Sequence, residues 1–457
     1  MVDIVWFRRD LRLGDNGALA AADQDVVPLF VLDPVLLTSA GGVRRERLLA
    51  SLRSLDSSIR ESGGAGLLIR RGDPVDVLPA VAGEVGADRV LVSGDYSPFG
   101  LRRDRRVAEA LSVAEVAMAS RDTPYLHPPA TVRKGDGGPF SVFTPYWRVW
   151  SGLSVPAPVQ SSPRFVTRLP PDDLPSDAPS RHPPSDDRSL GDGAVGEAAA
   201  LATLTGFADS GAAARYDDDR NRLDLPGTSQ LGAALHFGEI HPRTVLAHVG
   251  ADTAFVRQMC WRDFYADVLY RRPDAAWHNV DRRFDALPWR DDRSQFDTWC
   301  AGRTGYPVVD AGMRQLAQSG WMHNRARMIV ASFLTKDLLL PWQWGARWFL
   351  DHLVDGDVAS NSLGWQWCAG TGMDPSPYYR IFNPVLQGER FDPDGAYVRR
   401  WVPELAHLPG RAAHTPWDQP TGYDHGYPRR MVDHARARDD ALDAYRAVKA
   451  ARERATT

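Results

Sequence analysis

Residues 2–16 read VDIVWFRRDLRLGDN, and this stretch sets the fold of the first part of the chain. Its apolar run, residues 4–7, is short and unbroken, as expected of a strand that is buried on both faces. A turn rich in arginine and aspartate follows, and Asp15 and Asn16 stand where a side-chain cap would start a helix. The stretch therefore predicts a buried strand, a turn and a capped helix.

The same alternation continues along the chain. Further buried strands are predicted at residues 26–32, 66–70 and 89–93, and helices at residues 17–22, 45–60 and 74–85. Strands that alternate with helices predict a parallel, Rossmann-like sheet covered by helices. The pattern G-x-G-x-x-G does not follow the first strand, so the fingerprint of a dinucleotide-binding domain is absent.

Composition divides the chain into three parts. Residues 151–190 hold nine of the 34 prolines, which is typical of an extended linker. After residue 196 the pattern is helical and strand signals are nearly absent. We therefore expect an α/β domain over residues 1–130, a proline-rich linker over 131–195 and a larger all-α domain over 196–457.

Charge, hydropathy and cysteine usage exclude several classes of protein. The formal net charge of the 457 residues is -4, so a nucleic-acid contact must come from a local basic patch. No apolar run approaches the ~20 residues of a membrane span, and the N-terminus does not have the pattern of a signal peptide. Cys260, Cys300 and Cys368 are too widely separated for a disulfide framework or a spaced zinc site. We expect a cytoplasmic protein without a membrane span or a metal.

Two helical segments carry polar side chains suited to a ring-shaped ligand. On a helix, Asn324 and Met328 share one face, although a surface helix with scattered arginines would have the same sequence. Further on, Asp355, Asp357 and Asn361 precede two tryptophans. Asp-Gly-Asp is also a common turn and a partial calcium loop, but this stretch lacks the distal glutamate of such a loop. Carboxylates and an amide can instead bind the N–H groups and nitrogens of a ring.

A third segment is suited to a phosphate. Residues 227–231 read GTSQL and offer hydroxyl and backbone N–H groups directly before a helical stretch. The N-terminus of a helix is favourable for a pyrophosphate. The alternative is an ordinary Ser or Thr cap.

Together these segments resemble the photolyase/cryptochrome family of flavoproteins, most of all a bacterial class I cyclobutane pyrimidine dimer photolyase. The resemblance begins at WFRRDLR (6–12), includes FVRQMCWRDFY (255–265) and YRIFNP (379–384), and ends at WVPEL (401–405). It therefore covers nearly the whole chain. It implies an α/β domain for an antenna chromophore and an all-α domain that binds FAD and DNA.

The resemblance also implies roles for individual residues. FAD would be held by Tyr216, Thr228, Ser229, Gln230, Leu231, Gln258, Arg262, Asn324, Arg327, Asp355, Asp357 and Asn361. Asn361 would face the flavin N5, and Arg327 would pair with Asp355. Trp289, Trp342 and Trp365 would carry an electron from the surface to the flavin, with packing in the core as the alternative role.

The partner implied by the resemblance is UV-damaged DNA. The residues expected at the lesion and the DNA backbone are Arg220, Gln258, Trp261, Arg262, Asn324, Arg325, Met328, Trp367 and Arg380. The tryptophans and Met328 would form the walls of a pocket for a flipped lesion, and the arginines would contact phosphates. The expected activity is that of a deoxyribodipyrimidine photo-lyase, a carbon–carbon lyase that splits cyclobutane pyrimidine dimers by electron transfer from excited FADH⁻.

One residue departs from this pattern. Cyclobutane-dimer photolyases typically carry a glutamate at the position of Gln258, whereas glutamine occurs there in (6-4) photolyases and animal cryptochromes. The (6-4) enzymes typically carry histidines at the positions of Asn324 and Met328, and both are missing here. The cyclobutane dimer is therefore the favoured substrate. A (6-4) photolyase and a cryptochrome-type blue-light photoreceptor stay as alternatives.

A second chromophore is expected in the α/β domain. Arg44 and the segment GDYSPFG (94–100), which contains Asp95, resemble the pocket of relatives that bind 8-hydroxy-5-deazaflavin. Methenyltetrahydrofolate or an empty pocket is the alternative, and an ordinary turn after a strand would explain the segment equally well. The protein is expected to be a monomer.

Overall fold

The computed structural model describes all residues except 1, 172–194, 251–253, 376, 378–379 and 457. The chain divides into two compact units, and each is described by itself. Unit 1 comprises Met1–Ala214, Ser229–Pro273 and Val354–Asp357, and unit 2 comprises Arg215–Thr228, Asp274–Leu353 and Val358–Thr457. Residues 172–194 of the expected linker lie outside the described residues.

A parallel sheet forms the centre of unit 1. Its strands are β1 (Val2–Phe7), β2 (Asp25–Leu32), β3 (Leu68–Arg71), β4 (Ala87–Ser93), β5 (Ala117–Asp122) and β6 (Arg164–Phe165). The order is β3-β2-β1-β4-β5, and β6 pairs with β2. This confirms the expected α/β fold. The strands β5 and β6 were not predicted, because β5 is a partly exposed edge strand and β6 has two residues.

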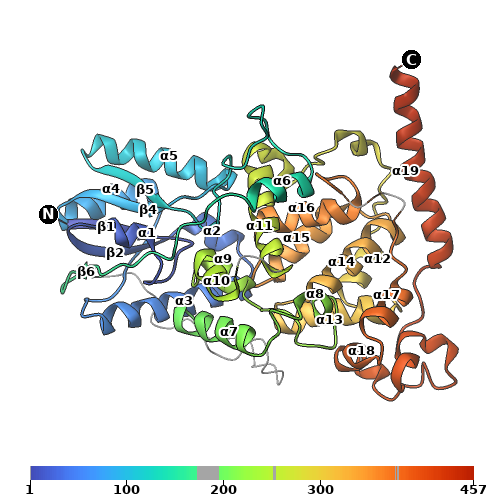
Figure 1. Cartoon of the computed structure of the whole chain (residues 1–457). Helices are drawn as coiled ribbons and strands as arrows, with labels where there is room; N and C mark the ends of the chain where they lie inside the picture. Colours follow the sequence, from blue (N-terminus) through green and yellow to red (C-terminus); the bar gives the residue numbers. More distant parts are fainter. Residues whose placement is uncertain (1, 172–194, 251–253, 376, 378–379, 457) are drawn as a thin grey trace. The chain divides into compact units, whose positions relative to one another are not determined.

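Helices cover both faces of this sheet (Figure 1). The helices of unit 1 are α1 (Gly17–Ala20), α2 (Pro34–Ser39), α3 (Gly42–Glu61), α4 (Pro74–Val85), α5 (Pro98–Val113), α6 (Phe143–Trp150), α7 (Glu197–Asp209), α9 (Gly232–Phe237), α10 (Pro242–Val249) and α11 (Ala254–Arg271). Along β1, Val5 and Phe7 pack in a cluster with α1 and α3, whereas Ile4 and Trp6 pack in a cluster with α4 and α5. Both faces of the strand are buried, which explains its unbroken apolar run.

Local capping explains where several of these helices begin. Asn16 accepts hydrogen bonds from the backbone N–H groups of Ala18 and Leu19 at 3.0 and 3.1 Å, which confirms the predicted cap of α1. The helix α5 was not predicted. It begins with Ser97 as its cap and Pro98 in its first turn, immediately after the segment expected to bind an antenna.

Part of the expected linker is folded. The helix α6 lies within residues 131–195 and buries Phe143, Tyr146 and Trp150. Phe143 and Tyr146 contact Phe264 of α11, with ring centroids 5.8 and 5.0 Å apart. Their helical spacing buries one face, so this stretch folds where prolines alone suggest an extended chain.

Among its described residues, unit 2 contains helices and connecting loops but no strand. Its helices are α8 (Tyr216–Asp219), α12 (Arg293–Cys300), α13 (Pro307–Ser319), α14 (Asn324–Ser332), α15 (Trp342–His352), α16 (Val358–Ala369), α17 (Pro384–Phe391), α18 (Ala396–Trp401) and α19 (His434–Thr456), and a π-helical segment, Phe333–Asp337, follows α14. A core rich in tryptophan includes Trp299, Trp342 and Trp365. The all-α prediction for this part of the chain is confirmed.

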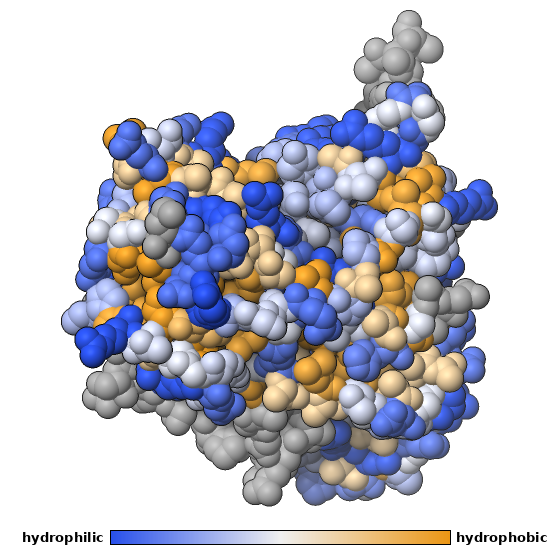
Figure 2. Space-filling view, turned by 60° about the vertical axis from the view of Figure 1, so that its left-hand side comes forward, coloured by the Kyte–Doolittle hydropathy of each residue, from blue (hydrophilic) through white to orange (hydrophobic). Residues whose placement is uncertain are grey.

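Exposed apolar side chains on the surface are scattered. Val35, Leu36 and Val113 are among the exposed large apolar residues. On the face shown in Figure 2, apolar patches alternate with hydrophilic ones. Among the described residues, no helix is long and apolar enough to cross a membrane, and no group of three His, Cys, Asp or Glu side chains is placed to hold a metal ion.

Candidate functional site

The expected FAD residues are divided between the two units. Unit 1 holds Ser229, Gln230, Leu231, Gln258, Arg262, Asp355 and Asp357, and unit 2 holds Tyr216, Thr228, Asn324, Arg327 and Asn361. Each group is therefore described within its own unit. The expected pair of Arg327 and Asp355 joins different units and stays a prediction.

In unit 1 the Asp-Gly-Asp loop lies against α9 and the end of β1. A Cβ at Gly232, the first residue of α9, would lie 2.6 Å from Asp355 Oδ2, so glycine permits the close approach of this carboxylate. Asp357 Oδ2 accepts a hydrogen bond from Arg9 Nη2 at 2.9 Å. Asp357 is therefore held by Arg9, and Asp355 lies close to Gly232, both from parts of the chain far away in sequence.

His236 of α9 lies close enough to Arg9, Asp355 and Asp357 for their charges to affect its pKa. Burial lowers the pKa of His236 to about 3, and the charge of Arg9 acts in the same direction. The imidazole is therefore neutral at physiological pH. Its Nδ1 atom is buried and meets no hydrogen-bond partner among the described residues.

The segment expected to bind a pyrophosphate forms a tight turn before α9. Gln230 has a φ of 54°, in the left-handed region, and Leu231 is the cap residue of α9. The helix start has no side-chain cap, and Ser229 Oγ accepts only a long bond of 3.4 Å from Leu231 N. The alternative of an ordinary Ser or Thr cap is therefore not what the structure shows.

In unit 2, Asn324 and Met328 lie on one face of α14, as their spacing predicted. Asn324 Nδ2 contacts Met328 Sδ at 3.8 Å, and Asn324 is exposed. Arg327 Nε donates to Met322 O at 2.7 Å, which fixes its side chain near the start of the helix. His323 caps the helix, because its Nδ1 accepts from Arg325 N at 3.1 Å.

The helix α16 presents a second polar face in unit 2. Asn361 Nδ2 donates to Ala346 O of α15 at 2.9 Å, which fixes the amide and leaves Oδ1 as its acceptor. Ser362 Oγ and Trp365 Nε1 are buried and have no hydrogen-bond partner among the described residues. Buried polar atoms without a partner are rare, and the Ser362 hydroxyl fits a bound ligand with polar groups.

The three expected electron-transfer tryptophans all belong to unit 2. Trp342 is fully buried and donates from Nε1 to Asn279 Oδ1 at 2.9 Å. Trp365 packs where Gly345 of α15 leaves room, since a Cβ there would collide with its ring. Trp289 is half-buried and packs against the core of unit 2. These contacts show packing, and the electron-transfer role stays a prediction.

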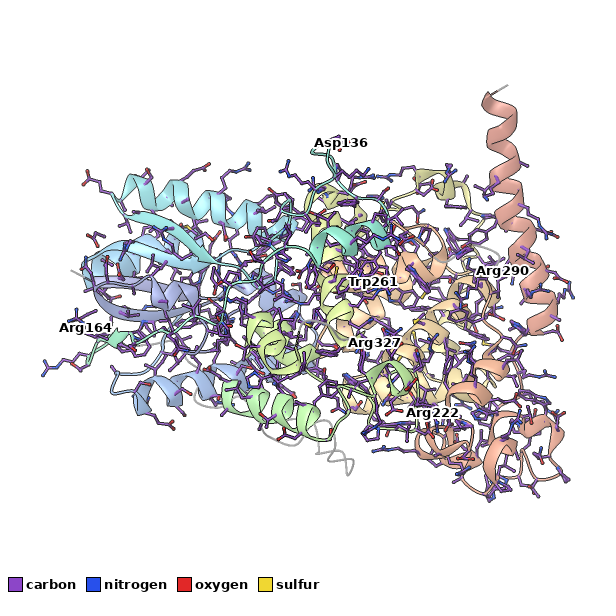
Figure 3. The ribbon with its side chains drawn as sticks, in the orientation of Figure 1. Asp136, Arg164, Arg222, Trp261, Arg290 and Arg327 are labelled. Atoms are coloured by element: carbon purple, nitrogen blue, oxygen red, sulfur yellow. The ribbon has the colours of Figure 1, made fainter. Side chains whose placement is uncertain are left out.

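The residues of α11 that were expected at the lesion belong to unit 1, and Figure 3 labels Trp261 among them. The ring of Trp261 stacks on Phe143, with centroids 3.7 Å apart and planes at 6°. Phe143 therefore holds the indole from one side, which the sequence did not reveal. Arg262 donates to the backbone oxygens of Pro124 and Leu235, and Gln258 is half-buried on the same helix.

Four arginines form a basic cluster in unit 2. The pKa of Arg325 is lowered to about 10, first by burial and then by the positive charges of Arg220, Arg380 and Arg390. Arg325 Nη2 donates to Asn221 Oδ1 at 2.6 Å, which orients its guanidinium. Mutual repulsion of this kind is relieved by an anion such as a phosphate.

This basic cluster contains three of the arginines expected at DNA, together with Arg390, which was not expected. The sequence feature that comes nearest to predicting Arg390 is its position on α17, the helix that starts at the end of the YRIFNP motif.

The expected antenna residue Asp95 already has partners in unit 1. Asp95 follows β4, accepts from Ser97 N at 3.0 Å and from Arg103 Nη2 at 3.2 Å. Burial opposes ionisation of this carboxyl, and Arg103, Arg9 and Arg8 outweigh burial, so its pKa lies below the ordinary value. These contacts fit the alternative of a structural turn as well as a binding site.

The α/β unit with its doubly wound sheet and the tryptophan-rich helical unit are the parts of a photolyase or cryptochrome. Residues 3–163 match the family model "DNA photolyase", and residues 255–447 match "FAD binding domain of DNA photolyase". The chain belongs to the DNA photolyase family. It is an enzyme of that family, and the match to an FAD-binding domain supports FAD as its cofactor.

Individual relatives agree with this membership. The chain is 44% identical to a deoxyribodipyrimidine photo-lyase of Streptomyces griseus, over 96% of this chain and 97% of the relative. A bacterial class III photolyase from Agrobacterium tumefaciens matches with a TM-score of 0.90 and 40% identity, over 98% of this chain and 97% of that one. A Synechocystis cryptochrome matches with a TM-score of 0.88 and 28% identity, over 97% and 99%. The expected family is confirmed, and the class I assignment stays a prediction.

Each unit, taken by itself, has polar groups that suit an FAD. Unit 2 offers an anchored amide at Asn361 and the buried Ser362 hydroxyl, which has no hydrogen-bond partner among the described residues. Unit 1 offers the carboxylate of Asp355, next to Gly232, and that of Asp357, which Arg9 holds. Acceptors and donors of this kind match the N–H and carbonyl groups of a flavin ring.

Proposed function

We propose that the protein repairs cyclobutane pyrimidine dimers in DNA under blue light. The observation that carries this proposal is the pair of Asn324 and Met328 on one face of α14, in contact at 3.8 Å. Neither side chain titrates near neutral pH, so this face packs and hydrogen-bonds but transfers no proton. Splitting a cyclobutane ring by electron transfer needs no acid–base partner there, whereas (6-4) enzymes typically carry histidines at these positions.

The chain's own residues would bind and orient the reactants. When bound, reduced FAD supplies the light-driven electron. Asp355, Asp357 and Asn361 would hold the flavin ring, and Asn361 would present its Oδ1, because Nδ2 is engaged by Ala346. Trp261, supported by Phe143, would form one wall of the lesion pocket.

The basic cluster of Arg220, Arg325, Arg380 and Arg390 would contact DNA phosphates. Its support is the lowered pKa of Arg325, which results first from burial and then from the positive charges of Arg220, Arg380 and Arg390. Phosphate contacts position a duplex without reading its sequence. This agrees with an enzyme that must act on lesions in any context, and with a negative net charge of the whole chain.

We also propose a second chromophore in unit 1, beside Arg44 and Asp95, with 8-hydroxy-5-deazaflavin as the first candidate. Asp95 follows β4, next to β1, where the strand order of the sheet reverses. In open α/β sheets, ligands bind outside the carboxyl ends of the strands at this point. The site would serve as an antenna, in a monomer that acts in the cytoplasm.

The second candidate function is that of a cryptochrome-type photoreceptor. The observation in its favour is Gln258, which is half-buried on α11 and cannot provide the carboxyl proton of a glutamate. Such a protein would bind the same FAD and respond to light without repairing DNA.

The test uses purified protein with its flavin reduced. Oligonucleotides that carry either a cyclobutane dimer or a (6-4) product are incubated under blue light and in darkness. We expect light-dependent repair of the cyclobutane dimer alone, and chromophores released by denaturation are identified by absorbance and mass. Repair of the (6-4) product alone would contradict the substrate assignment. Photoreduction of the flavin without any repair would favour the photoreceptor.

A further inference from the structure

The first motif of the chain, WFRRDLR, contains an arginine whose partner lies 348 positions away. Arg9 Nη2 donates to Asp357 Oδ2 at 2.9 Å, and both residues belong to unit 1. The side chains are 24% and 18% exposed, so the pair is sheltered but not sealed. The neighbouring arginines have other partners: Arg8 pairs with Asp104, and Arg12 binds the backbone oxygens of Asp15 and Gly238.

The backbone of Arg9 is fixed by the end of α9. Gly238 has a φ of 71°, and a Cβ there would collide with the backbone oxygen of Arg9. Leu11 N donates to Phe237 O at 3.2 Å beside it. Arg9 Nε also lies 3.5 Å from His236 O. Arg9 therefore reaches the loop from a rigid position, as a group that positions another residue must do.

The electrostatic environment keeps this arginine charged. Burial works against the charged form, but Tyr125, Asp357 and Asp95 outweigh it, so the pKa of Arg9 lies above its ordinary value. His236 is neutral, because burial and Arg9 lower its pKa to about 3. Of these groups, Arg9 therefore supplies the positive charge beside Asp357.

We propose that Arg9 is a positioning residue for the flavin: it orients the Asp357 carboxylate and neutralises its charge. This inference rests on the proposed function, in which Asp357 holds the flavin ring. A reduced, negatively charged flavin beside carboxylates is less unfavourable where a positive charge lies next to those carboxylates. The pair with Arg9 places a positive charge directly on Asp357 and leaves the carboxylate available as a hydrogen-bond acceptor.

The test measures the midpoint potential of the bound flavin by spectroelectrochemistry. Arg9→Gln removes the positive charge that is hydrogen-bonded to Asp357, so we expect a more negative potential. Asp357→Asn removes a negative charge and keeps Arg9, so we expect a more positive one. The double variant should return toward the wild-type value, and Arg9→Lys, which keeps the charge, should stay close to it.

Arg89→Gln is the matched control. Arg89 is 25% exposed, belongs to unit 1 and binds Asp3 at 2.8 and 2.6 Å, and Asp3 has no expected role at the flavin. The midpoint potential of the flavin in Arg89→Gln should equal the wild-type value. Retained flavin and the unfolding of the flavin-free protein are measured for every variant, to detect loss of fold.

Several outcomes overturn the inference. An unchanged potential in flavin-loaded Arg9→Gln would leave Arg9 with a structural role only, as would a double variant that does not return toward wild type. If Arg9→Gln loses its flavin, the midpoint potential of Asp357→Asn is used instead. A potential that is unchanged or more negative in Asp357→Asn overturns the inference. A wild-type chain that binds no flavin would overturn the proposed function as well.

Discussion

Trp365 lies in the core of unit 2, at a position where phenylalanine can replace tryptophan with little change in packing. Only 3% of its surface is exposed, and its Nε1 has no hydrogen-bond partner among the described residues. A phenylalanine would therefore lose ring area but no hydrogen bond found in this part of the structure. The glycine at position 345 that admits the indole ring also admits the smaller ring.

We expect Trp365→Phe to block photoreduction of oxidised FAD, because phenylalanine is much harder to oxidise than tryptophan. Repair by protein whose flavin has been reduced chemically should persist. Flash absorbance measures the first quantity, and dimer repair measures the second. Trp401→Phe is the control, since Trp401 is buried in the same core but has no expected role in electron transfer. Wild-type photoreduction in Trp365→Phe would remove this residue from the electron path.

At the scale of elements, α14 depends on a neutral histidine. His323 is 3% exposed, and its Nδ1 caps the helix by accepting from Arg325 N. Burial, followed by the charges of Arg327 and Arg325, lowers the pKa of His323 to about 4. A protonated imidazole could not accept this hydrogen bond. The start of the helix that carries Asn324, Arg325 and Arg327 is therefore sensitive to acid.

This arrangement predicts the sign of a pH effect. Between pH 6.5 and about 4, the unfolded chain binds a proton at position 323 that the folded chain refuses, so the free energy of unfolding falls as pH falls. At ~1.4 kcal/mol per pKa unit, the loss at pH 5 is about 2 kcal/mol. His323→Asn keeps a capping acceptor but does not titrate, so it should lose that much less stability between pH 7 and 5.

Urea unfolding of both proteins at the two pH values measures this difference. Parallel losses in the wild type and His323→Asn would show that His323 does not contribute.

At the scale of the whole molecule, charge is distributed unevenly. The formal net charge is -4, yet the basic cluster of unit 2 gathers Arg220, Arg325, Arg380 and Arg390. Long-range attraction to DNA is therefore weak, and affinity should come from a few local phosphate contacts. Binding through such contacts depends on salt in proportion to their number.

We expect Arg390→Gln to reduce the slope of log K against log salt by ~0.7–0.9, the value for one lost phosphate contact. The loss of affinity should be the same for lesions in different sequence contexts. Arg222→Gln is the matched control, because Arg222 (labelled in Figure 3) already binds Asp224 at 2.8 and 2.6 Å. Fluorescence anisotropy with damaged duplexes at several salt concentrations provides the slopes. Equal slopes for Arg390→Gln and the wild type would exclude Arg390 from the DNA contact.

Local patterns in the sequence determined much of the fold. Four of the parallel strands, the helix α4 and the Asn16 cap follow from short apolar runs and from hydrogen bonds between residues two or three positions apart. The pairing of Asn324 with Met328 follows from helical spacing in the same way. The helices α5 and α6 were not predicted, because their arginines and prolines made the apolar pattern hard to see. The buried face of each helix forms only when the helix packs against the rest of the unit.

What the sequence by itself determined, then, is the fold class, the family and the chemical character of the candidate residues. Only the tertiary structure placed Arg9 on Asp357, Phe143 beneath Trp261 and Arg390 among the basic cluster. Contacts between neighbours are set by backbone geometry, which repeats every two or 3.6 residues and can be seen in the sequence. Contacts across hundreds of residues are set by which surfaces pack together, and no local period records that choice.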